Sequence, residues 1–97
     1  MSAEPEAQRG KPLGVAITTI VGKFPNEDDY RRAHANERLQ TLLNIVKNAQ
    51  HLTNTDDWVV RVQPEGREVD PQRTFHEADL SCVVELDWHK REGGGGS

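Results

Sequence analysis

The apolar residues of this chain are confined to one continuous stretch, which limits the fold to a single small domain. Residues 1–11 (MSAEPEAQRGK) hold almost nothing that could form a hydrophobic core, and residues 90–97 (KREGGGGS) hold nothing. The folded unit is therefore expected to be residues 12–89, with a disordered leader before it and a flexible glycine-rich tail after it. Because a domain of this size buries only about 60% of its unfolded surface, its core is small and a deep substrate cavity is not expected.

Within residues 12–89, one helical pattern is surrounded by strand patterns. Asn36 is a good helix N-cap, and the apolar residues that follow it recur at helical spacing: Leu39, Leu42, Leu43, Val46 and Ala49. Four segments have the composition or alternation of strands, namely residues 13–21, 29–34, 57–63 and 82–88. The order β-β-α-β-β predicts an α+β fold in which a mixed sheet wraps around one helix.

The strand patterns also predict which side chains face the core. In the first strand Val15, Ile17 and Thr19 alternate with Ala16, Thr18 and Ile20, and Tyr30 is the best apolar anchor of the short second strand. One face of the third strand carries Trp58, Val60 and Val62, and one face of the last carries Cys82, Val84, Leu86 and Trp88. Residues 70–80 are expected to be a connector with one short helical turn.

Composition argues against several kinds of site. The net charge is −4 and the twelve basic residues are dispersed, so a nucleic-acid footprint is not expected. The only cysteine, Cys82, lies in an apolar strand pattern, where a free cysteine usually acts as a small hydrophobe and not as a nucleophile. The four histidines lack the spacing of metal ligands. No apolar run approaches the ~20 residues of a membrane span, and no secretion signal is evident. We expect a cytoplasmic protein that is not an enzyme and binds no metal.

The layout resembles that of the ubiquitin-like (β-grasp) family. The resemblance covers about residues 13–96 and lies in element order more than in identity. The stretch Arg73-Thr74-Phe75, followed by Glu77-Ala78-Asp79-Leu80, looks like the linker that precedes the last strand in ubiquitin. The last strand then runs into Lys90-Arg91-Glu92 and four glycines, which resembles the family's conjugation tail of a basic residue and then a glycine pair, although this tail is longer. Because its sequence diverges from ubiquitin and ends in this tail, the chain most resembles bacterial ubiquitin-like proteins from phage-defence conjugation systems.

The resemblance implies a protein modifier that is conjugated through a C-terminal glycine. An activating enzyme would adenylate the carboxylate with ATP, a conjugating enzyme would carry it as a thioester, and a target amine would accept it. The modifier itself would bind no cofactor. The conjugation tail would comprise Gly93, Gly94, Gly95 and Gly96, because glycine has no Cβ to obstruct the narrow channels of the enzymes. A processing peptidase would remove Ser97, and trimming as far as Gly94 stays open.

Three residues before the tail are candidates for partner binding. Lys90 and Arg91 lie where the family carries a basic residue that activating enzymes read. Trp88 would be a good contact residue if it is exposed, and otherwise it belongs to the core.

Three other interpretations of the chain stay open. Gly-Gly-Gly-Gly-Ser is also a common engineered linker unit, in which case the natural domain ends near Glu92. A β-grasp sulfur carrier with a C-terminal thiocarboxylate has the same fold and an adenylating partner, but such carriers usually end at glycine. A ubiquitin-like docking module would use its surface alone.

Overall fold

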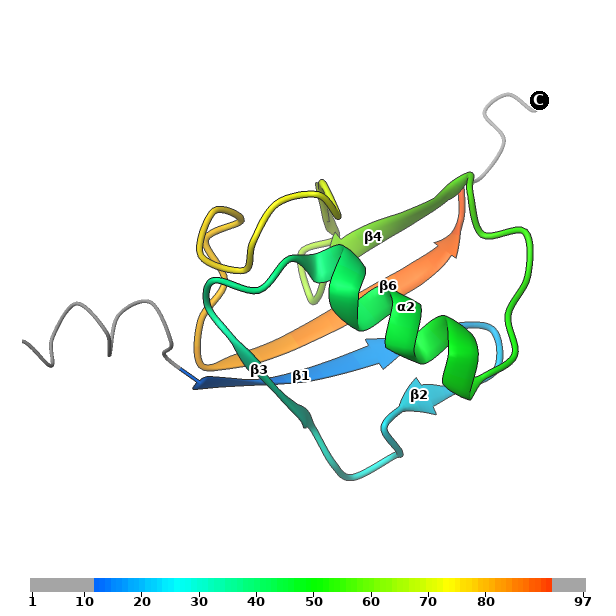
Figure 1. Ribbon diagram of the computed structural model, residues 1–97, viewed down its shortest axis with the longest axis horizontal. Helices are drawn as coiled ribbons and strands as arrows, with labels where there is room; N and C mark the ends of the chain where they lie inside the picture. The colour runs from blue at the N-terminus through cyan, green and yellow to red at the C-terminus, as the bar shows by residue number, and fades with distance from the viewer. Residues whose placement is uncertain (1–11, 92–97) are drawn as a thin grey trace, which may run out of the picture.

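The computed structural model describes residues 12–91. Its elements in chain order are β1 (Pro12–Thr18), β2 (Lys23–Phe24), β3 (Arg31–His34), α2 (Leu39–Ala49), β4 (Trp58–Val62), β5 (Arg67–Val69) and β6 (Val83–Lys90). The strands form one sheet in the order β2-β1-β6-β4-β5, and β3 pairs with β1 on the same edge as β2. β1 and β6 are parallel and the other pairs are antiparallel. α2 crosses one face of this sheet (Figure 1), which confirms the predicted mixed sheet wrapped around one helix.

The core lies between α2 and the face of the sheet that it covers. β1, α2, β4 and β6 supply most of the buried side chains, as their patterns predicted. From these elements come Leu13, Val15, Ile17, Leu39, Leu42, Leu43, Val46, Val60, Val62, Val84, Leu86 and Trp88. The connector between β5 and β6 adds Phe75, Ala78 and Leu80, and Phe75 is among the largest fully buried side chains. The two parallel central strands, β1 and β6, therefore form the middle of the sheet surface on which α2 packs.

The start of α2 differs from the predicted one. Asn36 is not the N-cap: that position is Arg38, which makes no side-chain capping bond. Instead, the N–H groups of Leu39 and Gln40 donate to the carbonyls of Arg73 and Pro71, at 3.0 and 2.8 Å. These two donors of the first turn are satisfied by main-chain carbonyls of the connector, so no capping side chain is required there.

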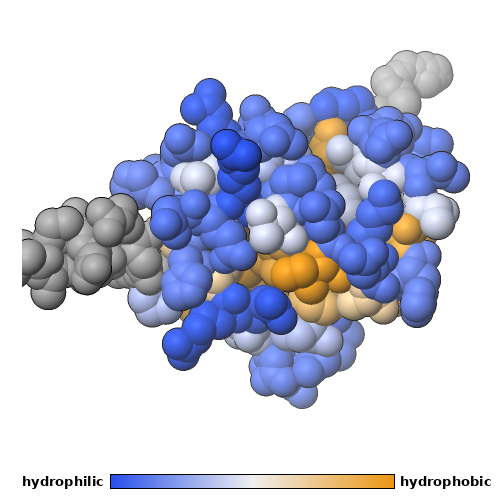
Figure 2. Space-filling model, in the orientation of Figure 1, coloured by the Kyte–Doolittle hydropathy of each residue, from blue (hydrophilic) through white to orange (hydrophobic). Residues whose placement is uncertain are grey.

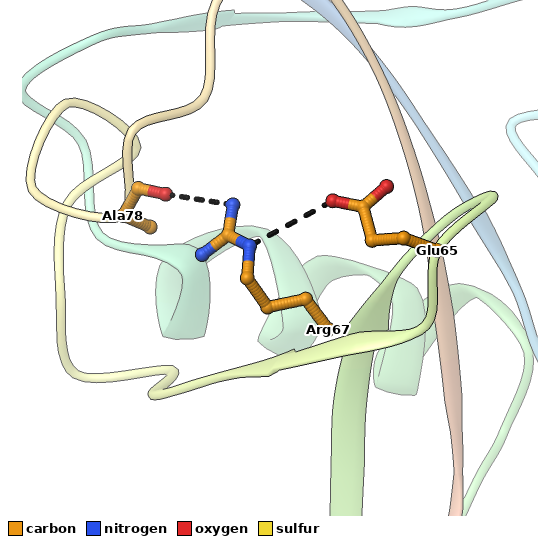
Figure 3. A network of polar contacts seen from close by, with 3 residues as sticks. All are labelled: Glu65, Arg67 and Ala78. Carbon is orange, nitrogen blue, oxygen red and sulfur yellow. Dashed lines mark hydrogen bonds and ion pairs between the residues drawn. The ribbon is translucent and has the colours of Figure 1, made fainter.

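The connector between β5 and β6 is held at both ends. It contains the predicted helical turn, in which Ala78 N–H donates to the Thr74 carbonyl at 3.0 Å. Thr74 and Glu77 cap this turn reciprocally, each side chain accepting from the N–H of the other residue at 3.0 Å. Arg67 of β5 donates to the Ala78 carbonyl at 3.2 Å and lies 3.7 Å from Glu65, and so ties the connector to the turn before β5 (Figure 3).

Two short strands were not predicted. β2 pairs Phe24 with Ile17 and Lys23 with Thr18, inside a segment whose glycine and proline indicated a turn. β5 pairs with residues 60–62 of β4, but only Val69 of its three residues is buried. Strands this short leave too few alternating positions for a period-two pattern to be recognised.

Two side-chain predictions and one strand boundary are wrong. Cys82 is exposed with a φ of +64°, because the chain bends before β6 begins at Val83. Tyr30 is exposed and precedes β3 instead of anchoring it. The first strand was expected to run to residue 21 but ends at Thr18, so Ile20 lies beyond it and is exposed.

Candidate functional site

β6 carries the first of the three residues that the sequence predicts for partner contact. The strand is bonded to β1 on one side and to β4 on the other, so it lies in the middle of the sheet. Trp88 is opposite Val60, is 3% exposed, and packs edge-on against Trp58 with ring centroids 5.2 Å apart. The exposure that a contact role requires is absent, so the structure assigns Trp88 to the core.

Lys90 and Arg91 are exposed at the end of β6. Arg91 N–H donates to the Asp57 carbonyl at 3.2 Å, and its Nη2 donates to Oε2 of Glu68 at 2.8 Å. About half of each side chain in this pair is exposed, at 55% for Arg91 and 46% for Glu68. Exposed pairs of this kind contribute at most ~1 kcal/mol, so Arg91 can exchange Glu68 for an acidic group of another protein at little cost. Its role in partner binding stays a prediction.

The predicted conjugation tail, Gly93, Gly94, Gly95 and Gly96, lies outside the described residues, as does Ser97. What the structure does describe is the position from which that tail continues. Residue 91 follows a strand that is bonded on both sides and lies at one end of the sheet (Figure 1).

The face of the sheet opposite α2 carries a cluster that sequence reasoning missed. The ring of Tyr30 lies over Gly14 of β1, where a Cβ would be only 3.1 Å from the Cβ of Tyr30. The Tyr30 hydroxyl donates to Oε2 of Glu85 on β6 at 2.8 Å, and Nζ of Lys23 lies 5.5 Å from the ring centre. A glycine inside a strand often marks such a close approach, and Gly14 in the β-branched first strand was the available signal.

Tyr30 provides a direct test of this cluster. The hydrogen bond to Glu85 raises the pKa of Tyr30 above its ordinary value of 10.0, with further contributions from desolvation and from the negative charge of Glu85. Tyr30 is the only tyrosine of the chain, so near-ultraviolet titration of tyrosinate reads this residue alone. We expect Glu85→Ala to lower the measured pKa toward that of a free tyrosine.

Glu65→Ala removes the same charge from a distant turn and should leave the Tyr30 titration unchanged. Because the folded-state pKa is raised, the stabilisation from this bond is present below about pH 10 and is lost as the pH rises through the folded-state value. An identical titration in Glu85→Ala would show that the Tyr30–Glu85 contact does not form.

The rest of this open face is largely polar. Arg61 of β4 lies opposite Asp87 of β6, and Nε2 of Gln63 donates to Oδ2 of Asp87 at 3.0 Å. The exposed side chain of Val83 is at the opposite end of β6 from the pairing of Val59 with His89. Val59 and Val83 therefore do not join in an apolar recognition patch.

Neither of two hollows in the surface formed by residues 12–91 pairs a nucleophile with a histidine base. One, of about 620 Å³, lies beside Trp58 and is bordered by Glu68, Asp70 and Arg91. The hollow next to Cys82 is lined by Pro12, Leu13, Gly14, Tyr30 and Arg32, without a histidine to act as a base. Among residues 12–91 there is no group of three potential metal ligands, and no helix has the length and apolarity to cross a membrane.

Comparison with solved structures identifies the architecture. A protein designed de novo on the basis of ubiquitin is similar, with a TM-score of 0.63 and 21% identity over 89% of this chain and 96% of that one. The ubiquitin-like domain of tubulin-binding cofactor B is similar at a TM-score of 0.61 and 14% identity, over 91% of this chain and 97% of that one. Ubiquitin of Caldiarchaeum subterraneum is similar at a TM-score of 0.57 and 14% identity, over 87% of this chain and 99% of that one.

No protein-family model matches the chain, and no curated protein matches its sequence. The three structural neighbours named above are each matched along more than nine-tenths of their own length. At these identities the likeness concerns the backbone architecture. The chain has the ubiquitin-like β-grasp fold.

Proposed function

We propose that this chain is a protein modifier, conjugated to target amines through the carboxylate of a C-terminal glycine in residues 93–96. An activating enzyme would join the carboxylate to AMP from ATP with release of pyrophosphate. A cysteine thiolate would displace AMP to form a thioester, and a conjugating enzyme would present that thioester to the target. The amine of the target would then displace the thiolate and form an amide. A peptidase would first cleave before Ser97.

The observation that carries the proposal is the position of β6. A central strand, bonded on both sides, ends at two exposed basic residues at one end of the sheet. The chain continues from that point as Glu92 and four glycines. Glycine allows a backbone to enter a narrow channel, and the strand before it would fix the place on the folded domain from which the tail starts.

ATP dependence tests the proposal. An amino-terminally tagged full-length chain, added to an extract of cells that express it, should form heavier tagged species that survive reduction and denaturation. Removing ATP with apyrase should abolish these species, because adenylation precedes every later bond. If heavier species are absent with ATP present, conjugation is refuted. A docking function then remains, as is suggested by neighbours that are ubiquitin-like domains of other proteins.

Arg91 allows a test of recognition by the activating enzyme. Arg91→Glu should lower the initial rate of conjugate formation about tenfold or more, because a like charge facing an acidic enzyme surface costs more than ~1.4 kcal/mol. Arg73→Glu makes the same charge change at another exposed position and should have no comparable effect. Glu68→Ala, which removes the side-chain partner of Arg91, should not lower the rate. Equal rates in the Arg73 and Arg91 variants would exclude recognition through Arg91.

A further inference from the structure

The three lysines within residues 12–91 differ in their surroundings. Nζ of Lys23 lies 5.5 Å from the ring centre of Tyr30, an arrangement that favours the charged ammonium. Lys90 is exposed at the end of β6, among the residues considered above for partner binding. Lys47 is half-buried in the last turn of α2 and lines a hollow between the helix and the start of β4. These surroundings make Lys47 the candidate for a nucleophilic amine.

The hollow beside Lys47 measures about 370 Å³ and is rich in hydrogen-bonding groups. The polar side chains that line it come from α2 and from the loop before β4, namely Gln40, Asn44, Lys47, Thr55 and Asp56. Nε2 of Gln40 donates to Oδ1 of Asn44 at 2.9 Å, which leaves the amide nitrogen of Asn44 available as a donor. A run of glycines presents only main-chain N–H and C=O groups, so it requires hydrogen-bonding partners and little room. The lining of this hollow therefore suits a glycine tail.

Lys47 and Asp56 are the two charged residues of this lining. No ion pair joins them, and Nζ of Lys47 makes no hydrogen bond or ion pair within residues 12–91. A lysine attacks a carbonyl carbon only as the neutral amine, so a site for such chemistry needs a group that accepts the proton of the ammonium. Asp56 supplies a carboxylate that no other cation of the described residues occupies. The hollow thus combines a nucleophile with a base.

We propose that Lys47 accepts the C-terminal glycine of a second copy of this chain, which joins two copies by an isopeptide bond. The inference rests on the proposed function, which supplies that glycine as a thioester on the conjugating enzyme. Asp56 would take one proton from the Lys47 ammonium, and the neutral nitrogen would add to the thioester carbonyl. As the C–N bond forms, the C–S bond breaks, and a second proton of the nitrogen passes to the departing thiolate. The Asn44 amide would donate to the carbonyl oxygen as it gains negative charge.

The donor is a second copy and not the chain's own tail. The hollow that Arg91 lines shares Asp56 and Trp58 with the hollow of Lys47, so the own tail starts nearby. Residues 92–96 span at most ~17 Å when extended, and a tail held in an enzyme channel has no length left to return to its own domain. Polar side chains cover most of the helix side of the molecule, apart from one apolar area (Figure 2). We therefore expect a transient encounter with the donor, because stable interfaces between copies are more apolar.

Acyl transfer without enzymes tests Lys47 independently of the proposed function. The purified full-length chain is mixed with Glu-Gly-Gly-Gly-Gly as its 2-mercaptoethanesulfonate thioester, and mass spectrometry measures acylation of each lysine. Near neutral pH, Lys47 should react at least about fivefold faster than Lys23, because it has a base beside it. Asp56→Asn should remove most of this preference, and Asp57→Asn, the same change at the next residue, should keep it. The effect of Asp56→Asn should shrink toward about pH 10, where lysine loses its proton unaided. Equal acylation of Lys47 and Lys23 near neutral pH would overturn the inference.

The extract assay then tests the bond between copies. Two full-length versions with different amino-terminal tags should form ATP-dependent species that carry both tags, with the Glu-Gly-Gly-Gly-Gly remnant on Lys47 after trypsin. Lys47→Arg should lower these species at least about tenfold, because a guanidinium keeps its proton, and Lys23→Arg should leave them within about twofold of the wild type. Conjugates to other proteins should persist in both variants. Two-tag species that persist in Lys47→Arg would overturn the inference and leave the proposed function standing. A remnant on Lys47 in chains of monomer mass would contradict a second copy as donor, and a wild-type chain without any conjugate would refute both proposals.

Discussion

Phe75→Ala is expected to remove most of the stability of the domain. Phe75 is fully buried, and truncating a buried phenylalanine to alanine costs about 3–5 kcal/mol through lost burial and the cavity left behind. A domain of about 80 residues has a total stability of roughly 4–12 kcal/mol. The melting temperature should therefore fall by roughly 15–30 °C. Urea or thermal unfolding followed by circular dichroism measures this loss.

His76→Ala is the matched control, because His76 is the next residue and its side chain is exposed. Its effect on the free energy of unfolding should stay within about 0.5 kcal/mol. Phe75 also sits in the part of the connector that satisfies the start of α2, so its loss should weaken two elements together. A change below about 1 kcal/mol in Phe75→Ala would mean that the connector does not close the core as described.

Deleting residues 93–97 is expected to abolish conjugation completely and to leave the melting temperature within about 2 °C of the wild type. The deleted residues have no apolar side chain to bury, so they contribute nothing to the core. The proposed reaction, by contrast, loses the glycine carboxylate, and the new terminus at Glu92 carries a side chain beside the reacting carbonyl and lies five residues closer to the folded domain. Heavier tagged species in the extract assay measure the first effect, and thermal unfolding measures the second.

Deleting residues 2–6 removes the same number of residues from the other end and should preserve the conjugates. A finer variant, Gly96→Val, should lower conjugate formation at least about tenfold, since a branched side chain next to the reacting carbonyl obstructs the approach of the enzyme cysteine. Conjugates that persist after deletion of residues 93–97 would show that the bond is formed elsewhere in the chain.

The main architecture could be predicted because its elements are long and strongly patterned. β1, α2, β4 and β6 each alternate or repeat over five or more residues, and their buried faces fix the layers. β2 and β5 were not predicted because their own composition does not indicate strands. They are strands because they pair with β1 and β4. The start of α2 was not predicted because the N–H groups of its first two residues donate to carbonyls more than 30 positions away in the sequence. Local capping signals cannot report such long-range partners.

The functional surface was less predictable than the fold. Tryptophan is a residue type that is common at protein contacts, but only the structure, with Trp88 of β6 opposite Val60 of β4, shows that Trp88 is buried. The Tyr30–Glu85 bond joins residues 55 positions apart, which no local pattern indicates. Ile20 and Val21 continue a β-branched run, so their sequence alone could not separate the end of a strand from an exposed turn.

Mass spectrometry of the protein recovered from cells that express it tests the modifier proposal most directly. Free chains should end at a glycine, with Gly96 expected, after loss of Ser97. Trypsin cuts after Arg91, so target lysines should carry a branched Glu-Gly-Gly-Gly-Gly remnant when Gly96 is the terminus. Chains that keep Ser97, with no branched lysine in any protein, would contradict the account. A terminal thiocarboxylate, with one oxygen exchanged for sulfur, would instead identify a sulfur carrier.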